Sequence, residues 1–184
     1  MARPKTSGKA AAAAPRPSEA AAELVSLGIE EAMALCERAA QAAGAGEEAA
    51  RSMARSAVAA EAEGRAPVGL AHFVDYLEAL RAGRIDGSAE PVVTRPALCV
   101  YLADAGGGAA HTAFDRTIDD LVRSAGLFGM ALFAQKNALT CGALSYFTGR
   151  LVERGLVAPA PASIAGALAA ASATSPRSAS LPVK

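Results

Sequence analysis

The chain has 184 residues, and its 18 basic and 18 acidic side chains give a formal net charge of zero. This neutral balance argues against nucleic-acid binding, which usually needs a basic surface. No apolar run approaches the roughly 18 residues that cross a bilayer, so we expect no membrane partner. Apolar residues make up 52% of the chain, but 49 residues are alanines. Larger apolar side chains are therefore only about a quarter of the chain, which is enough for one thin core.

The cysteines and histidines are few and widely spaced. Cys36, Cys99 and Cys141 form no C-x-x-C pair, which predicts free thiols in a reducing compartment and therefore a cytoplasmic location. His72 and His111 lie 39 residues apart, too far for a two-histidine metal site on one helix. We expect no metal ion.

The two ends differ from the middle in composition. Residues 1–18 begin with basic residues and prolines, among them Arg3, Pro4 and Lys5, and are predicted to be a disordered leader. Residues 158–184 are rich in alanine, proline and serine and are predicted to be a low-complexity tail, in which residues 164–173 could form a weak helix. Residues 19–157 are therefore expected to contain the organised domain.

The organised part opens with a predicted helical hairpin. One helix has Glu30 and Glu31 in its first turn and ends near Gly44, and the next begins at Glu47 and is stopped by Gly64. A third helix carries an apolar stripe at helical spacing, which comprises Leu70, Phe73, Val74, Leu77 and Leu80.

The pattern then changes to alternating strands and helices. Residues 91–94 and 97–103 predict two strands, and a helix through Phe114, Ile118 and Leu121 ends at Gly126. Residues 129–134 predict a strand buried on both faces, followed by a helix over residues 144–152 and a strand from Leu156. The expected fold class is α/β, with an N-terminal helical bundle followed by a β-β-α-β-α-β half-sheet.

Few residues have a spacing that by itself indicates a catalytic or ligand-binding site. Gly106–Gly108 precedes a helix, but it lacks the G-x-G-x-x-G spacing and any following Lys-Ser/Thr, so a plain turn is favoured over a phosphate loop. Arg116 is expected to pair with Asp119 or Asp120 on the helix surface. His72 and His111 are expected to be packed or solvated rather than catalytic.

Several segments together resemble the malate/L-lactate dehydrogenase family, which is distinct from the Rossmann-fold lactate dehydrogenases. Gly64-Arg-Ala-Pro-Val-Gly-Leu-Ala-His is similar to the region around a D-S-H-G-L-A-R segment, and Arg81-Ala-Gly-Arg-Ile matches R-x-G-x-I. The run from Gly129 through Lys136-Asn137-Ala-Leu-Thr-Cys-Gly is similar to a pattern ending V-R-N-S-N-H-F-G. The resemblance covers the N-terminal half of the family's length and implies a partial dehydrogenase domain with a non-Rossmann fold.

This chain differs from the family pattern at the positions where the pattern has histidine. Val68 occupies the histidine position of the first segment, and Thr140 occupies that of the N-H-F-G segment. Neither side chain transfers protons well near neutral pH, so no competent catalytic residue is expected. Lys136 replaces an arginine and Asn137 is retained, so these two residues are the expected contacts for a substrate anion.

The resemblance implies an NAD- or NADP-dependent oxidoreductase acting on 2-hydroxy or 2-oxo acids. Because both histidines are replaced, we expect a truncated, diverged homologue without ordinary dehydrogenase activity. Two alternatives remain open. One is an active oxidoreductase with altered chemistry, on an imine or keto acid, and the other is a non-enzymatic dimerisation or interaction module. The thin core favours association with a second copy or a partner chain.

Overall fold

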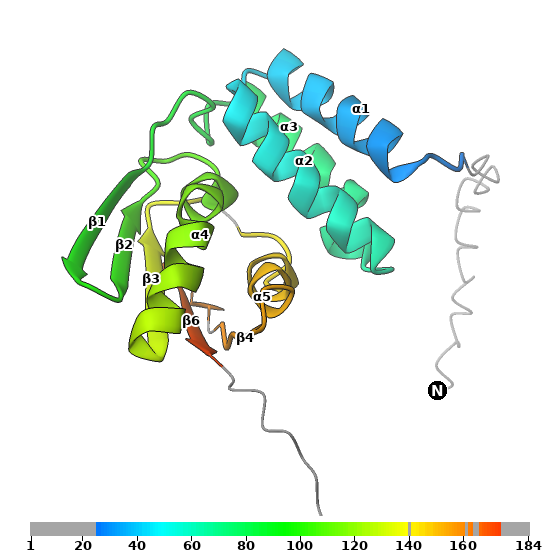
Figure 1. The fold of residues 1–184 in the computed structure, drawn as a ribbon. Coiled ribbons are helices and arrows are strands. Elements are labelled where there is room, and N and C mark those ends of the chain that lie inside the picture. The colour runs from blue at the N-terminus through cyan, green and yellow to red at the C-terminus, as the bar shows by residue number, and fades with distance from the viewer. Residues whose placement is uncertain (1–24, 140, 161, 164–165, 174–184) are drawn as a thin grey trace, which may run out of the picture.

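The structure is a computed structural model that describes residues 25–139, 141–160, 162–163 and 166–173. Figure 1 shows three helices from the N-terminal part beside a mixed sheet that carries two further helices. This arrangement confirms the predicted α/β fold class, in which a helical bundle precedes a β-β-α-β-α-β segment. The predicted leader, residues 1–18, lies outside the described residues.

The helical unit contains α1 (Ile29–Ala42), α2 (Glu47–Ala62), the short 3₁₀ helix η1 (Ala66–Val68) and α3 (Leu70–Arg81). Both predicted hairpin helices are confirmed, and each has two glutamates in its first turn, where they complement the helix dipole. Alanines occupy the contact between the helices, and Ala40, Ala50 and Ala54 are fully buried. Small side chains at these positions let the helices pack closely.

The predicted stripe on α3 is only partly correct. Phe73 and Leu80 are buried as expected, but Val74 is 52% exposed and Tyr76 is buried instead. One residue turns an α-helix by about 100°, so Val74 lies at the flank of the face that Phe73 and Leu80 define. Hydrophobicity alone placed Val74 in the core, whereas the packing of α3 selects Tyr76.

The sheet is built from β1 (Val92–Ala97), β2 (Val100–Asp104), β3 (Met130–Lys136), β4 (Leu156–Val157), β5 (Ala162–Ser163) and β6 (Gly166–Ala173). Its order is β1-β2-β3-β6-β4, and β5 pairs with β6. β2 and β3 are parallel and are connected through α4 (Ala110–Phe128), while the other strand pairs are antiparallel. α5 (Ser145–Val152) connects β3 to β4.

The position of β6 was not anticipated from composition. Residues 158–184 were expected to form a tail, with a weak helix at 164–173, yet residues 166–173 form a strand between β3 and β4. Its pairing with β3 runs from Met130 opposite Ser172 to Gln135 opposite Ala167. A strand needs only backbone N–H and C=O groups to extend a sheet, so an alanine-rich segment can fill an open edge.

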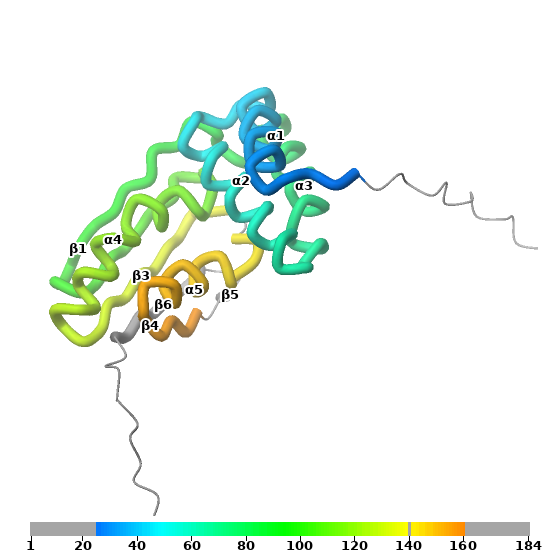
Figure 2. Tube along the Cα trace, turned by 45° about the vertical axis from the view of Figure 1, so that its right-hand side comes forward, coloured from blue at the N-terminus to red at the C-terminus, as the bar shows by residue number. Residues whose placement is uncertain are grey.

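The sheet has one covered face and one open face, whereas strand 129–134 was expected to be buried on both. Tyr101, Ala103, Ala131 and Phe133 point toward α4 and α5 and belong to one buried cluster. The alternating residues on the other face are more exposed, and Leu102 and Met130 are 41% and 52% exposed. Figure 2 shows α4 and α5 on the same side of the strands.

The covering helix α4 also ends later than predicted. It continues past Gly126 to Phe128, and Gly129 follows with a φ of 80°. A left-handed residue ends a helix at little cost only when it is glycine, so Gly129 rather than Gly126 terminates α4.

Candidate functional site

Val68 and Thr140, the two positions predicted to correspond to histidines of the resembled family, lie in different parts of the chain. Val68 is the last residue of η1 and is half-buried. Next to it, Gly69 approaches α2 so closely that an added Cβ would lie 2.4 Å from Glu61 Oε2. The Leu70 amide donates to the same carboxylate at 2.9 Å, which fixes this turn against α2. Thr140 lies outside the described residues.

The predicted anion-binding residues Lys136 and Asn137 are brought together at the carboxyl end of β3, beside Asp104 at the end of β2. Lys136 Nζ lies 3.2 Å from Asp104 Oδ2, and Asn137 Nδ2 donates to both oxygens of Asp104 at 3.0 Å. The hydrogen bond from the Gly106 amide, followed by those from Asn137 and Lys136, lowers the pKa of Asp104. The positive charge of Lys136 is therefore compensated by a carboxylate that the sequence analysis did not consider.

The glycine run after β2 does not form a phosphate loop. The Gly106 amide donates to Asp104 Oδ1 at 3.0 Å, Gly107 donates to the carbonyl of Asn137 at 2.7 Å, and Gly108 donates to that of Ala105 at 2.9 Å. A phosphate cradle needs several free backbone N–H groups aimed at one point. All three amides already have acceptors, two within the turn and one at Asn137 after β3, which agrees with the interpretation of Gly106–Gly108 as a plain turn.

A groove of about 580 Å³ lies on the open face of the sheet, next to the Asp104–Lys136 pair. It is lined by Val92, Thr94, Leu102, Ala103, Asp104, Ala134, Gln135 and Lys136. Lys136 is the single cationic side chain among these lining residues, and it is paired with Asp104. These residues do not fit the diphosphate of a nicotinamide dinucleotide, which carries two negative charges, so we assign no step to that cofactor here.

His111 lies in the first turn of α4 and is completely buried. Its Nε2 is 3.1 Å from the carbonyl oxygen of Cys141, and because a carbonyl only accepts, this nitrogen carries the proton. The other nitrogen, Nδ1, has no hydrogen-bond partner among the described residues. The ring stacks on Phe147 with centroids 5.5 Å apart. Burial lowers the pKa of His111 to about 4, although the negative charge of Asp115 and the hydrogen bond to Cys141 act in the opposite direction.

His72 occupies a different environment on α3. Its Nδ1 lies 2.9 Å from Asp75 Oδ2, one helical turn away, and its ring contacts the edge of Tyr76. This surface pair agrees with the expectation that His72 is not catalytic. Neither imidazole therefore faces the groove.

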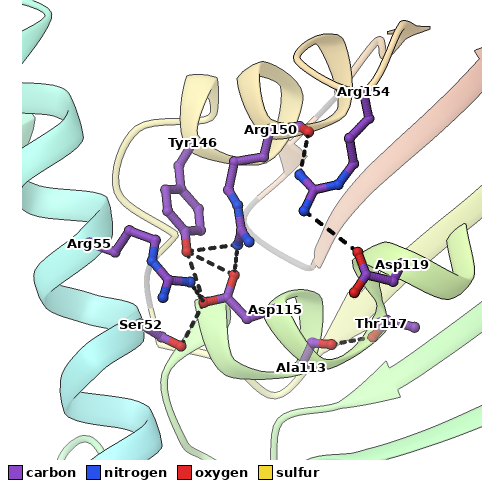
Figure 3. A network of polar contacts seen from close by, with 9 residues as sticks. All are labelled: Ser52, Arg55, Ala113, Asp115, Thr117, Asp119, Tyr146, Arg150 and Arg154. Carbon is purple, nitrogen blue, oxygen red and sulfur yellow. Dashed lines mark hydrogen bonds and ion pairs between the residues drawn. The ribbon is translucent and has the colours of Figure 1, made fainter. Parts of the chain in front are cut away.

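Asp115 is the residue that sequence reasoning missed. It lies on α4, its side chain is only 10% exposed, and it is contacted by residues from α2 and α5 (Figure 3). Ser52 Oγ donates to it at 2.8 Å, Arg55 lies at 3.2 Å, the Tyr146 hydroxyl donates at 2.7 and 2.9 Å, and Arg150 makes a further ion pair.

This network joins the helical unit to the sheet unit. Burial, together with the negative charge of Asp115, raises the pKa of the Tyr146 phenol, so this hydroxyl stays protonated as a donor. A signal for the network was present in the spacing, since Tyr146 and Arg150 are four residues apart and lie on one helix face. Nothing in the sequence indicates that Asp115 is their common partner.

The prediction for Arg116 was wrong. It pairs with Glu48 of α2 and with Glu90, at 2.8 Å, rather than with Asp119 or Asp120. Asp120 pairs instead with Arg123, and Asp119 with Arg154. Long arginine side chains reach across an interface, so a partner on another element can replace the neighbour on the same helix.

The described residues contain neither a metal-binding cluster nor a membrane-spanning helix. No group of three or more His, Cys, Asp or Glu side chains is placed to hold a metal ion there. None of the helices in the described ranges is long and apolar enough to span a membrane.

Comparisons with known proteins agree with the motif-level resemblance. A family model described as malate/L-lactate dehydrogenase matches residues 27–183. A Δ1-pyrroline-2-carboxylate reductase of Ancylobacter novellus is 33% identical over 136 residues, which are 74% of this chain and 40% of the relative.

Solved structures show the same fold. A Δ1-piperideine-2-carboxylate reductase of Pseudomonas syringae pvar. tomato matches with a TM-score of 0.70 and 27% identity, over 73% of this chain and 41% of that one. A malate dehydrogenase of Entamoeba histolytica matches with a TM-score of 0.66 and 20% identity, over 72% of this chain and 37% of that one. The chain thus spans about 40% of the length of the relatives it matches.

Proposed function

Because the chain belongs to the malate/L-lactate dehydrogenase family, we propose that it is a diverged member of this oxidoreductase family that does not reduce 2-oxo acids by histidine-mediated proton transfer. The family's chemistry takes its hydride from NAD or NADP, and no described residue is assigned to that cofactor. The chain spans only part of its relatives' length, so their activities are not carried over directly.

One observation carries this proposal: the described part of the chain offers no imidazole to the groove or to the motif position at Val68. His111 is sealed inside the protein with its pKa lowered to about 4, and His72 is paired with Asp75. Reduction of a carbonyl needs a proton on the oxygen as hydride arrives, and a positioned acid typically contributes about 10²–10⁴ in rate.

Reduction of a cyclic imine is the second candidate function. The names of two relatives, a Δ1-pyrroline-2-carboxylate reductase and a Δ1-piperideine-2-carboxylate reductase, favour it. An imine nitrogen is far more basic than a carbonyl oxygen and takes its proton from water before hydride arrives. Loss of a histidine donor therefore affects imine reduction less than oxo-acid reduction.

The test is a direct comparison of the two substrate classes. The purified chain is incubated with NADH or NADPH and with pyruvate, oxaloacetate, Δ1-pyrroline-2-carboxylate or Δ1-piperideine-2-carboxylate. We expect no turnover of either oxo acid above the uncatalysed rate. Measurable turnover of pyruvate or oxaloacetate contradicts the main proposal, whereas turnover of an imine alone supports the second candidate.

A second experiment separates the effect of the histidines from that of chain length. In a full-length family member that keeps both histidines, valine replaces the first and threonine the second. We expect oxo-acid reduction to fall by about 10² or more and imine reduction to fall less. An equal loss for both substrate classes would argue against a selective role of the imidazoles.

A further inference from the structure

The strand register shows how the groove is built. Asp104 lies opposite Val92 on β1 and opposite Lys136 on β3, so the polar pair has an apolar neighbour on its β1 side. Leu102 lies opposite Thr94 and Ala134, and this row is the next on the same face. The groove therefore has an apolar floor of Leu102 and Ala134 and, at one end, one carboxylate and one ammonium group.

The carboxylate at this end is held in a fixed orientation. Asn137 donates to both Asp104 oxygens and the Gly106 amide donates to one of them. Asn137 itself adopts a φ of 55°, which is uncommon for a residue with a side chain. The side chains of Asp104 and Lys136 are 35% and 67% exposed, so both charges remain accessible to a ligand.

We propose that this groove binds a zwitterionic cyclic amino acid of the proline or pipecolate type. The ligand's carboxylate contacts Lys136, its ring ammonium contacts Asp104, and its ring lies on Leu102 and Ala134. The proposal rests on the candidate imine-reductase function, because such amino acids are the products of reducing cyclic imine carboxylates.

Charge complementarity selects this ligand class over simpler ones. In an α-amino acid the ammonium and carboxylate are adjacent, which matches a cation and an anion whose Nζ and Oδ2 atoms are 3.2 Å apart. A 2-hydroxy acid offers a carboxylate for Lys136 but no cation for Asp104. The groove's volume lies within the usual range of small-molecule sites, and it lies near the carboxyl ends of two parallel strands, where α/β proteins commonly bind ligands.

Binding is measured on the full chain by two-dimensional NMR with amide-labelled protein. L-proline and L-pipecolate are titrated to about 50 mM, since so small a ligand at an open site is expected to bind in the millimolar range. We expect saturable shifts at Leu102, Ala134 and Lys136. Cyclopentanecarboxylate lacks the ammonium group, and pyrrolidine lacks the carboxylate. Each should bind at least roughly tenfold more weakly than L-proline.

Two variants test the charges separately. Lys136→Met and Asp104→Asn should each weaken proline binding roughly tenfold. Lys136→Met removes a largely exposed side chain and is expected to fold, so it remains informative if Asp104→Asn disturbs the turn at Gly106. Arg123→Met, which breaks the exposed Arg123–Asp120 pair on α4, is the matched control and should bind as the wild type does.

The outcomes distinguish this inference from the function it rests on. Absence of saturable shifts, or shifts that both charge variants leave unchanged, overturns the groove as the amino-acid site. If the chain nevertheless reduces a cyclic imine, the candidate function stands and its ligand site lies elsewhere. Saturable, charge-dependent binding without imine turnover supports the groove and counts against catalysis.

Discussion

At the scale of single residues, burial determines what His111 can do. Its ring is enclosed by Phe147, Tyr76 and Tyr146, and the pKa falls to about 4 because the charged form is poorly solvated there. At neutral pH the imidazole is therefore an uncharged packing group with one hydrogen bond. Glutamine is a suitable replacement for this ring, because its side-chain amide can still donate a hydrogen bond but does not titrate.

We predict that His111→Gln changes how the free energy of unfolding depends on pH. Above pH 6.5 His111 is neutral in both states, but between pH 6.5 and 4 the unfolded chain binds a proton that the folded chain does not. The free energy of unfolding of the wild type should therefore fall with decreasing pH by up to about 1.4 kcal/mol per unit more than that of the variant. Urea unfolding of both proteins at several pH values measures the difference. A constant difference from pH 7 to pH 4 would contradict the predicted titration.

Gly142 is a residue whose backbone and surroundings both require glycine. Its φ is 56°, and an added Cβ would lie 2.8 Å from the Tyr76 hydroxyl oxygen. We predict that Gly142→Ala lowers the free energy of unfolding by about 1–3 kcal/mol. The matched control is Gly126→Ala, in α4, where nothing lies within 4 Å and alanine should be neutral or stabilising. Thermal unfolding of both variants checks the contrast, and equal effects would count against the backbone argument.

At the scale of elements, Asp115 connects three helices. Ser52 and Arg55 reach it from α2, and Tyr146 and Arg150 reach it from α5. Because one carboxylate accepts from all four side chains, the orientation of α2 and α5 on α4 depends on its charge. Arg116, which contacts Glu48 of α2, is a second link between the same helices.

We therefore predict that Asp115→Asn destabilises the protein strongly. Removing one partner of a largely buried ion pair leaves the arginines uncompensated and typically costs about 3–5 kcal/mol. The control, Arg51→Gln, breaks an exposed pair with Glu47 on α2 and should change stability by less than about 1 kcal/mol. Denaturant unfolding measures both, and a loss in Asp115→Asn no larger than in the control would refute the role of the network.

At the scale of the whole molecule, β6 closes the sheet beside β3. Without β6, the described part of β3 would present an unpaired backbone edge next to the buried residues Ala131 and Phe133. Unpaired edges with apolar neighbours promote association between chains. The alanine-rich strand β6 therefore stabilises the sheet through its backbone hydrogen bonds to β3.

The last prediction follows from this position of β6. A chain ending at Ala160 should be less stable and should associate at concentrations where the full chain does not. A chain ending at Thr174, which retains β6, is the control and should behave as the full chain does. Light scattering and thermal unfolding compare the three proteins. Identical behaviour of all three would show that β6 contributes nothing to the sheet.

The sequence by itself determined the family and the order of the elements as far as β4. Periodicity and glycine positions placed the helical hairpin, and the motif around Lys136 and Asn137 identified the relatives that the comparisons support. These features are local, because helical periodicity, turn glycines and short motifs each depend on residues that lie close together in the sequence. The prediction that Val68 and Thr140 stand at the family's histidine positions rests on the same kind of local motif, and it stays a prediction.

Only the tertiary structure decided which distant residues meet. Asp115 gathers partners 31 to 63 positions away, and Asp104 compensates Lys136 across a parallel strand pair. It also decided that His111 is sealed and that β6 completes the sheet. The physical reason is that burial and long-range pairing depend on how the elements pack. The residues next to a charged side chain or a strand edge in the sequence do not indicate which distant residue will pair with it.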